Sequence, residues 1–522
     1  MGKLSFHVTE RDARGPILPR AIEELTSKEG LSLRFLRGRE VQREISYPEL
    51  YADMMRRAAN FRALGLRKGD RVAFILPETD DFVLSFLGAL AAGVVPVPMY
   101  PPLSFGKLDA YLDTAAKIAN AAGVRMLVTD KRAQSVLWSL VDRVDSIKEL
   151  HTVDVLERRI ADDVEMIDLH DITPDDVAFL QFTSGSTADP KGVIVTHGSL
   201  LSNLHGIMNV GLAIEEDDAA VSWLPLYHDM GLIGMVLAPV WYGVPTTYIP
   251  TMDFVKQPSL WMETMSKYRA SLSFAPNFAY SLAVKRTRES KLAEMDLSCV
   301  KALGCGAEPN HPETLRTFLE YFAPAGLQST VLLPAYGMAE ATLAIAFHEL
   351  HDELRTDVID ADRYEAEGVA LAVDLNDDVT VRVAEHVSCG TPFPGHEVVI
   401  VDEHNRELPE RHVGQIVVRG ASVTPGYFQE PEKTRETFSE IGLLTGDLGY
   451  IADGTRAVAQ ALPVAADDRR AAVAVAAAHE LVEGHDADEG DLRQRRLELL
   501  AAHVELLGEL VLAGGPVVLG LE

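Results

Sequence analysis

The residue string with the clearest chemical potential is rich in hydroxyl groups and glycine. It follows a short apolar segment, residues 177–180, and reads Gln181-Phe182-Thr183-Ser184-Gly185-Ser186-Thr187-Ala188-Asp189-Pro190-Lys191-Gly192-Val193. Small hydroxyl residues and glycine let backbone N–H groups and hydroxyls converge on an anion, and Lys191 adds a positive charge. The string therefore indicates a loop that would hold a triphosphate. A plain Ser/Thr/Gly turn is the alternative, and a Walker-type loop is excluded because its Gly-Lys-Ser/Thr spacing is absent.

Further strings with chemical potential follow along the chain. In order they are Trp223-Leu224-Pro225-Leu226-Tyr227-His228-Asp229-Met230-Gly231-Leu232, Gly304-Cys305-Gly306-Ala307-Glu308-Pro309, Tyr336-Gly337-Met338-Ala339-Glu340-Ala341-Thr342 and Thr445-Gly446-Asp447. Glycine lets another group approach the backbone closely, and the carboxylate of Glu340 is an oxygen ligand of the kind that hard cations prefer. Taken alone, His228 beside Trp and Pro would more often be packed core, and one Thr-Gly-Asp tripeptide is a weak signal.

In this order, the five strings resemble the motifs of the adenylate-forming superfamily, which includes acyl-CoA synthetases, peptide synthetase adenylation domains and luciferases. The resemblance implies ATP and Mg²⁺ as cofactors, and it makes His228 and Lys191 the candidate catalytic residues, with His228 between the nucleotide and carboxylate pockets. It also implies that Tyr336 stacks on adenine, that Asp447 bonds the ribose hydroxyls and that Glu340 and Thr183 hold the metal. The implied nucleotide-binding residues are Thr183, Ser184, Gly185, Ser186, Thr187, Gly306, Ala307, Glu308, Pro309, Tyr336, Gly337, Met338 and Asp447.

Within that superfamily the chain resembles the fatty acyl-AMP ligases more than the CoA ligases. The strings that recur in that branch are Pro96-Val97-Pro98-Met99-Tyr100-Pro101-Pro102, the Leu-Pro-Leu-Tyr-His-Asp-Met-Gly string, Ala275-Pro276-Asn277-Phe278-Ala279-Tyr280 and the Tyr336 string continued to Leu343. Residues 352–387, acidic and apolar-poor in their first half, lie where the branch carries its insertion; the plain alternative is a solvated surface excursion. The resemblance implies that the insertion hinders the domain rotation of CoA chemistry, leaving an acyl carrier protein as acceptor. Candidate acyl-binding residues are Phe274, Asn277, Phe278 and Tyr280, although core packing is the commoner fate of such residues.

The elements that must position these strings follow an α/β pattern. Helical periodicity predicts helices at residues 47–66, 81–92, 108–122 and 134–144, and short apolar runs between them predict strands at 71–76, 94–98 and 125–129. This alternation predicts a doubly wound layout with mixed, mostly parallel sheets flanked by helices. Residues 397–402 and 414–419 predict strands of a smaller, more antiparallel lobe. We therefore expect an AMP-binding large domain over residues 1–452, with the insertion near 352–387.

Composition and net charge argue against some classes of binding partner and of cellular location. The chain has 522 residues, of which 47% are hydrophobic and 24% charged, as in ordinary globular proteins, and no run of about 18 apolar residues predicts an integral membrane segment. A formal charge of −30 argues against nucleic acid or an anionic membrane as the main partner. Three cysteines are too few for a disulfide framework, and the N-terminus lacks the apolar core of a secretory signal, so we expect a cytoplasmic location.

Residues 456–522 differ from everything before them. They contain only Ala, Val, Asp, Glu, Gly, Leu, Pro, His, Gln and Arg, the residues encoded by codons that begin with G or C. In a GC-rich gene a shift of reading frame produces this alphabet, so we hypothesise a frameshift near Gly454 or Thr455, with residues 453–522 replacing the family's C-terminal domain. The alternative is a natural Ala-rich helical tail, since residues 491–512 show helical amphipathicity.

This tail bears on activity. The resemblance implies that the C-terminal domain supplies a lysine that bonds the carboxylate and the α-phosphate as the adenylate forms, yet residues 456–522 contain no lysine. The segment before the Thr-Gly-Asp string reads Gly442-Leu443-Leu444 where the family has Trp-Leu-Arg. We therefore expect the chain to bind ATP and fatty acid but to form the adenylate slowly.

The expected function is adenylation of a fatty acid by ATP, giving acyl-AMP and pyrophosphate, for transfer to a carrier protein of polyketide, non-ribosomal peptide or lipid biosynthesis. Three alternatives remain open at this point. They are a long-chain acyl-CoA ligase, a non-catalytic nucleotide- or acyl-binding remnant, and a kinase-like phosphotransferase, which would release ADP rather than AMP.

Overall fold

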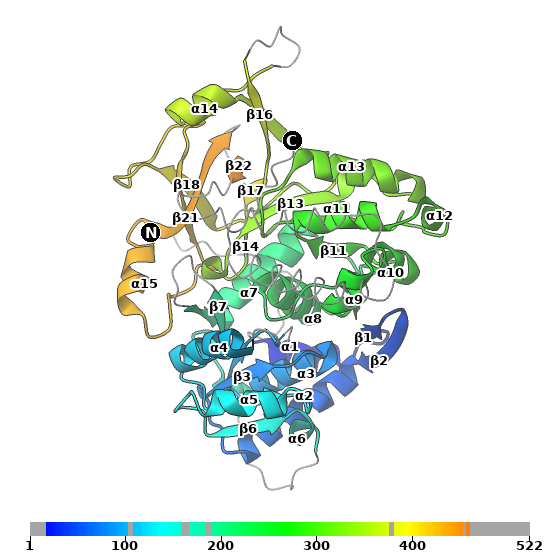
Figure 1. Cartoon of the computed structure of the whole chain (residues 1–522), viewed down its shortest axis with the longest axis vertical. Coiled ribbons are helices and arrows are strands. Elements are labelled where there is room, and N and C mark those ends of the chain that lie inside the picture. The colour runs from blue at the N-terminus through cyan, green and yellow to red at the C-terminus, as the bar shows by residue number, and fades with distance from the viewer. Residues whose placement is uncertain are drawn as a thin grey trace, which may run out of the picture.

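The computed structural model describes residues 17–102, 108–158, 166, 168–183, 190–374 and 381–452, and the backbone of 456–459. Figure 1 shows the N-terminal elements at one end of the molecule, a central body of helices and strands, and a β-rich lobe at the other end. Among the described residues, no helix is long and apolar enough to cross a membrane. The predicted nucleotide-binding residues Ser184, Gly185, Ser186 and Thr187 lie outside the described residues, as does the tail beyond residue 459.

The N-terminal end is built on a parallel sheet of order β4-β3-β5-β6. Its strands are β3 (Arg71–Ile75), β4 (Val95–Pro98), β5 (Met126–Thr129) and β6 (Glu149–Thr152). The helices of this region are α1 (Leu18–Leu25), α2 (Tyr47–Ala63), α3 (Thr79–Ala91), α4 (Leu108–Ala122), α5 (Gln134–Val141) and α6 (Asp154–Glu157). The predicted alternation of helices and strands is confirmed here. Helix α2 ends before the predicted residue 66 because Gly65 takes a φ of 82°, a left-handed conformation that stops a helix.

The central body carries a nine-stranded sheet of order β17-β14-β13-β12-β11-β9-β10-β1-β2. Its strands are β1 (Ser32–Arg37), β2 (Glu40–Ser46), β9 (Ala220–Ser222), β10 (Thr246–Tyr248), β11 (Leu272–Ala275), β12 (Ala302–Cys305), β13 (Leu332–Gly337), β14 (Ala344–Phe347) and β17 (Thr391–Pro392). Strands β9, β11, β12 and β13 are parallel neighbours, whereas β14 and β17 add antiparallel pairs at one edge. All residues of β9, β11 and β12 are buried, as expected for parallel strands covered on both faces.

Helices cover this sheet and fill the space toward the N-terminal end (Figure 1). They are α7 (His197–His205), α8 (Ala238–Tyr242), α9 (Thr251–Lys256), α10 (Leu260–Tyr268), α11 (Asn277–Arg286), α12 (Glu289–Leu292) and α13 (Pro312–Phe322), with π-helical segments η3 (Gly206–Gly211) and η4 (Met230–Leu237). Trp241 and Trp261 are the largest side chains fully buried in this core. The hydrophobic surface buried here supplies the dominant stabilisation of the body.

A separate two-stranded hairpin carries the predicted phosphate string. Strand β7 (Val177–Thr183) pairs antiparallel with β8 (Lys191–Thr196), so that Thr183 lies opposite Lys191. The apolar segment at residues 177–180 therefore lies in β7, and the described ends of the string lie in β7 and β8.

The far lobe is the predicted antiparallel one. Its sheet contains β18 (His396–Val401), β19 (Gly414–Gly420), β20 (Phe438–Ser439), β21 (Gly442–Ala452) and β22 (Arg456–Ala459), with α15 (Pro431–Thr437) beside it. Strand β22 lies within the anomalous tail and pairs antiparallel with β21.

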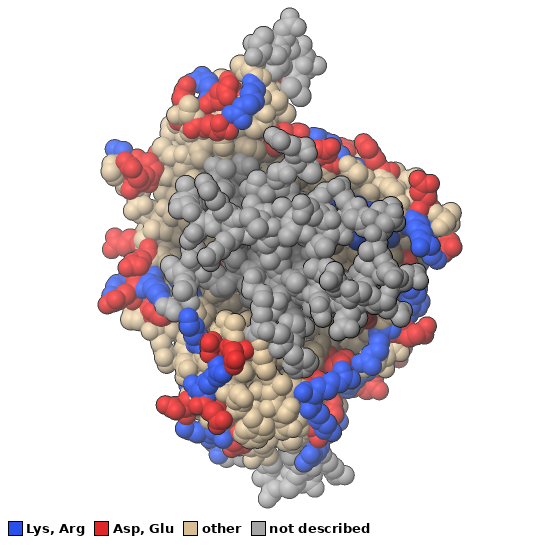
Figure 2. Space-filling model, in the orientation of Figure 1, with Lys and Arg blue, Asp and Glu red and all other residues tan. Residues whose placement is uncertain are grey.

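The described part of residues 352–387, called the inserted unit below, contains β15 (Thr356–Asp360) paired antiparallel with β16 (Val383–Val387), and α14 (Ala361–Glu367) follows β15. Asp360 caps α14 by accepting from the N–H groups of Asp362 and Arg363 at 3.0 Å each. Acidic and basic side chains lie intermixed over α14 (Figure 2), where Arg363 pairs with Glu367 and Arg382 pairs with Asp362. The unit is anchored to the lobe by Asp357.

Candidate active site

Four predicted strings meet at one edge of the nine-stranded sheet. The His228 string follows β9, the acyl string follows β11, the Gly306 turn follows β12 and the Tyr336 string spans the end of β13. Because these four strands are parallel, their carboxyl ends lie at the same edge, the usual place for a ligand site in such sheets. The topology therefore gathers segments that are far apart in the sequence.

Tyr427 links the predicted metal ligand to the phosphate hairpin. Its hydroxyl donates a hydrogen bond of 2.7 Å to Oε1 of Glu340, and Nζ of Lys191 lies 5.1 Å from the centroid of its ring. Backbone bonds fix this arrangement, since the N–H of Phe428 donates to Gly192 O at 2.7 Å. Sequence reasoning missed Tyr427, because its role depends on a contact between segments that no local spacing reveals.

Glu340 is a buried carboxylate, and its neighbours act on its pKa in opposite directions. Only 8% of the residue is exposed, and this burial raises its pKa, while the Tyr427 hydroxyl and the charge of Lys191 act to lower it and Asp229 acts to raise it. A divalent cation at this carboxylate would stabilise its charged form.

The donor set suits Mg²⁺ better than a metal held wholly by protein. In the part of the chain that the structure describes, no group of three or more His, Cys, Asp or Glu side chains could hold a metal ion. Mg²⁺ is commonly bound through one or two carboxylates plus substrate phosphates. Glu340 fits this pattern, and Thr183 ends β7 opposite Lys191.

The loop that carries Glu340 is tightly folded. Thr342 takes a φ of 71° and a ψ of −60°, which is strained for a β-branched residue. Its hydroxyl donates to Ser422 O at 2.6 Å, and a Cβ added at Gly337 would lie 2.0 Å from Leu343 O. The backbone of the loop is thus held by contacts on both sides of Glu340.

His228 lies at the start of η4 beside a buried carboxylate. Its Nδ1 is 2.8 Å from Oδ1 of Asp229, and that carboxylate also accepts from the N–H of Met230 at 2.7 Å. Burial acts to raise the pKa of Asp229, but His228 and the backbone donors outweigh it and hold the pKa below its usual range. Asp229 therefore orients the imidazole as an ionised partner.

The predicted nucleoside residues come together across two sheets. The hydroxyl of Tyr336, on β13, donates to Oδ2 of Asp447, on β21, at 2.8 Å. Burial raises the pKa of both groups. The ring and the carboxylate are thus adjacent, as a site for a base and its ribose requires. Met338 and Tyr336 are both partly buried and pack against the same small hydrophobic cluster.

The Gly306 turn packs directly on the acyl string. Oε1 of Glu308 accepts from the N–H of Phe278 at 2.6 Å, and a Cβ added at Gly304 would lie 1.9 Å from the ring of Phe274. Ala307 takes a φ of 70°, which turns the chain between Gly306 and Pro309.

The acyl candidates divide into two groups. Phe278 is half-buried, and its ring lies 6.2 Å from that of Trp223, next to the His228 string. Tyr280 is fully buried, with its ring 4.9 Å from Phe318 and its hydroxyl bonded to Gly304 O at 2.7 Å. Asn277 accepts from the N–H of His311 at 3.1 Å. Tyr280 and Asn277 therefore make contacts that support the turn.

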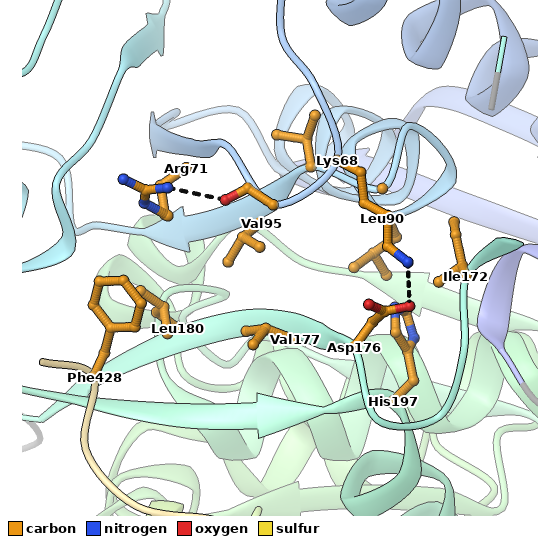
Figure 3. Close-up of a pocket in the computed structure, with 13 residues that line it drawn as sticks. Lys68, Arg71, Leu90, Val95, Ile172, Asp176, Val177, Leu180, His197 and Phe428 are labelled. Atoms are coloured by element: carbon orange, nitrogen blue, oxygen red, sulfur yellow. Dashed lines mark hydrogen bonds and ion pairs between the residues drawn. The ribbon is translucent and has the colours of Figure 1, made fainter. Parts of the chain in front are cut away.

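A cavity of about 160 Å³ lies elsewhere, between β3, β4 and β7 (Figure 3). None of the predicted site residues lines it. Lys68 pairs with Asp176 at 2.6 Å, and Arg71 donates to the carbonyl oxygens of Ala122, Gly69 and Gly123. Protein groups therefore already pair with both cations in the lining of this cavity.

Comparison with known proteins identifies the family of the chain. The model of the family described as AMP-binding enzyme matches residues 31–428. A Caulobacter vibrioides protein, provisionally named an acyl-CoA synthetase, is 36% identical over 85% of this chain and 77% of its own length. A long-chain-fatty-acid–AMP ligase of Mycobacterium marinum is 34% identical over 74% of this chain and 67% of its own.

Another relative and a solved structure extend the comparison. A medium-chain-fatty-acid–[acyl-carrier-protein] ligase of Moorena producens is 32% identical over 74% of this chain and 66% of its own. One of the solved fatty acyl-adenylate ligases from E. coli and L. pneumophila superposes with a TM-score of 0.83, at 30% identity, over 94% of this chain and 92% of that one. The chain belongs to the AMP-binding enzyme family and is a relative of the fatty acyl-AMP ligases.

Proposed function

We propose that this chain binds ATP, Mg²⁺ and a fatty acid, and that the fatty carboxylate attacks the α-phosphate to give acyl-AMP and pyrophosphate. The observation that carries the proposal is the pairing of two clusters at one sheet edge. Tyr336 and Asp447 are hydrogen-bonded at 2.8 Å, while Glu340, Tyr427 and Lys191 lie together beside the phosphate hairpin.

Each cluster has a proposed role. Tyr336 stacks on adenine against the turn of Gly306, Ala307 and Pro309, and Asp447 accepts from the ribose hydroxyls. Lys191 and the hairpin string hold the phosphates, so that their positive charge and N–H groups stabilise the leaving pyrophosphate. Glu340 and the Thr183 hydroxyl would hold Mg²⁺, which when bound neutralises phosphate charge.

The carboxylate is proposed to enter beside His228. Asp229 holds Nδ1 of the imidazole at 2.8 Å, which fixes the ring while the substrate carboxylate approaches. The neighbouring rings of Phe278 and Trp223 offer the fatty chain an apolar surface, with the buried Phe274 as a further candidate. Little covalent chemistry is asked of these residues, so positioning supplies most of the rate.

We propose an acyl carrier protein as the acceptor of the acyl group. The Moorena producens relative is named for that acceptor, and the predicted insertion near residues 352–387 contains the antiparallel pair of β15 and β16. CoA is the second candidate, because the Caulobacter relative is named for it. Thioester formation on a carrier protein, compared with formation on free CoA, separates the two.

The composition of the tail bears on the expected rate of adenylate formation. Residues 456–522 contain no lysine, so the cation that the family brings to the α-phosphate has no counterpart there. We therefore expect ATP and fatty acid to bind while adenylate forms slowly. Resequencing the gene at the codons for Gly454 and Thr455 tests the frameshift directly.

The test is to incubate the full chain with ATP, Mg²⁺ and saturated fatty acids of graded length, and to detect acyl-AMP by mass spectrometry. Lys191→Ala should lose acyl-AMP, whereas Lys285→Ala, at an exposed position, should not. Release of ADP in place of AMP would contradict the proposal. ATP binding without any acyl-AMP would identify a non-catalytic remnant.

A further inference from the structure

Helix α11, which presents Phe278 to the proposed acyl site, has no cap of its own. Its N-cap residue is Pro276, whose side chain has no hydrogen-bonding group. The first four N–H groups of a helix have no partner within the helix and need an acceptor from elsewhere. The start of α11 therefore depends on another segment.

Glu308 supplies that acceptor from the turn after β12. Its Oε1 accepts from the N–H of Phe278, the second residue of α11, at 2.6 Å. In the opposite direction, Oδ1 of Asn277 accepts from the N–H of His311 at 3.1 Å. The turn and the helix start are thus fastened by two hydrogen bonds between side chain and backbone.

Strands β11 and β12, which precede the helix and the turn, also contact each other closely. The ring of Phe274, on β11, fills the space over Gly304, on β12, where an added Cβ would meet it at 1.9 Å. The Tyr280 hydroxyl, from α11, donates to Gly304 O at 2.7 Å. Because these contacts leave no space between the two strands and the helix, we expect a movement of residues 306–309 to move the start of α11 as well.

We propose that Glu308 is a positioning residue that couples the adenine side of the site to the acyl side, so that ATP and the fatty acid bind cooperatively. The inference rests on the proposed function, because it takes residues 306–309 as the adenine contact and Phe278 as part of the acyl wall. When the base fixes the turn, Glu308 holds the first turn of α11 in place for the fatty chain. By linkage, the fatty acid tightens ATP binding by the same factor.

The experiment measures this coupling on the full chain. Isothermal titration gives the Kd of dodecanoic acid with and without saturating α,β-methylene-ATP and Mg²⁺, and then the reciprocal Kd values. The wild type should bind each ligand at least about fivefold more tightly in the presence of the other, within the usual range of coupling. Glu308→Ala should reduce the factor to less than about twofold. Glu308→Gln keeps the acceptor and should retain most of the coupling.

Two controls separate positioning from folding. Glu320→Ala, at an exposed position on α13, should leave the coupling at the wild-type value. Glu308→Asp, whose carboxylate is one methylene shorter, should lose coupling even if Glu308→Ala fails to fold. Hydrogen exchange of the first turn of α11 gives a direct reading, because the ATP analogue should slow it in the wild type and not in Glu308→Asp.

The outcomes are distinct. Equal coupling in the wild type, Glu308→Ala and Glu308→Asp overturns the inference and leaves the proposed function standing, as does a wild type that binds both ligands independently. A wild type that binds neither ligand overturns the proposed function, and the inference with it.

Discussion

The hydroxyl of Tyr427 donates a 2.7 Å hydrogen bond to Oε1 of Glu340, while the Tyr427 ring lies 5.1 Å from Nζ of Lys191. One aromatic side chain thus contacts both the proposed metal ligand and the proposed phosphate cation. A partner that orients a metal ligand commonly matters nearly as much as the ligand itself. Tyr427 is therefore the first residue to test.

Tyr427→Phe should raise the Mg²⁺ concentration needed for ATP binding by roughly 10-fold, in line with other residues that orient metal ligands. The ring under Lys191 remains, so ATP affinity at saturating Mg²⁺ should change little. Calorimetric Mg²⁺ titration of ATP binding measures both. Tyr51→Phe removes a matched Tyr–Glu bond, of 2.9 Å to Glu23, at the surface and should have no effect. An unchanged Mg²⁺ requirement in Tyr427→Phe would contradict the assignment of Glu340.

Glu308 should give the protein a distinctive pH dependence. Burial raises the pKa of Glu308 to about 7 from its ordinary 4.5, although the Phe278 N–H acts to lower it. Between these values the folded state holds a proton that the unfolded state has lost, so this group's contribution to stability falls as pH rises from 4.5 to about 7 and is constant above that. The facing thiol of Cys305 stays neutral in this window because burial raises its pKa as well.

Glu308→Gln should remove that slope. Relative to the wild type, the variant should gain about 3 kcal/mol in free energy of unfolding between pH 4.5 and 7. Urea denaturation at a series of pH values measures the difference. Glu320→Gln, on an exposed part of α13, serves as the control and should run parallel to the wild type. If the free energies of unfolding of Glu308→Gln and the wild type changed with pH in parallel, the carboxyl would not be protonated near neutrality.

Gly337→Ala should destabilise the fold by about 3 kcal/mol or more, because its Cβ would lie 2.0 Å from Leu343 O and the backbone must move. Gly368→Ala is a contrasting variant. Its φ of 65° strains an alanine, but nothing lies within 4 Å of the added Cβ. It should cost only about 1 kcal/mol. Denaturant midpoints rank the two, and equal losses would mean that the Glu340 loop is less rigid than described.

Asp357 anchors the inserted unit to the far lobe, and Asp357→Ala should release it. Its carboxylate accepts from the Tyr450 hydroxyl at 2.8 Å and pairs with Arg411 at 3.0 Å, so the variant leaves two partly buried donors without it. We expect a loss of about 2 kcal/mol and faster proteolysis between β15 and β16. Glu367→Ala, which breaks only the surface pair with Arg363, should cost less than about 0.5 kcal/mol. Protection of the unit in Asp357→Ala would show that other contacts hold it.

The elements of the fold were largely predictable from local pattern. The predicted helix at residues 108–122 is α4 with the same bounds, and the predicted strand at 71–76 is β3 less one residue. Such periodicity is a local property, because the apolar residues on the buried face recur every two residues in a strand and every 3.6 residues in a helix. Element ends were less predictable, as at α2, where the conformation of Gly65 decides the end of the helix.

The sequence by itself determined the kind of chemistry, since the residue types and order of the strings around Lys191, His228, Glu340 and Asp447 predict phosphate, carboxylate, metal and ribose contacts. Only the tertiary structure decided which side chains from distant segments contact one another. Tyr427 meets Glu340 across 87 residues, and Glu308 caps α11 across 30. Tyr280, predicted to contact the fatty chain, is buried against Phe318 and supports the turn from below. These pairings depend on how sheets and helices pack, and packing joins residues whose separation along the chain carries no periodic signal.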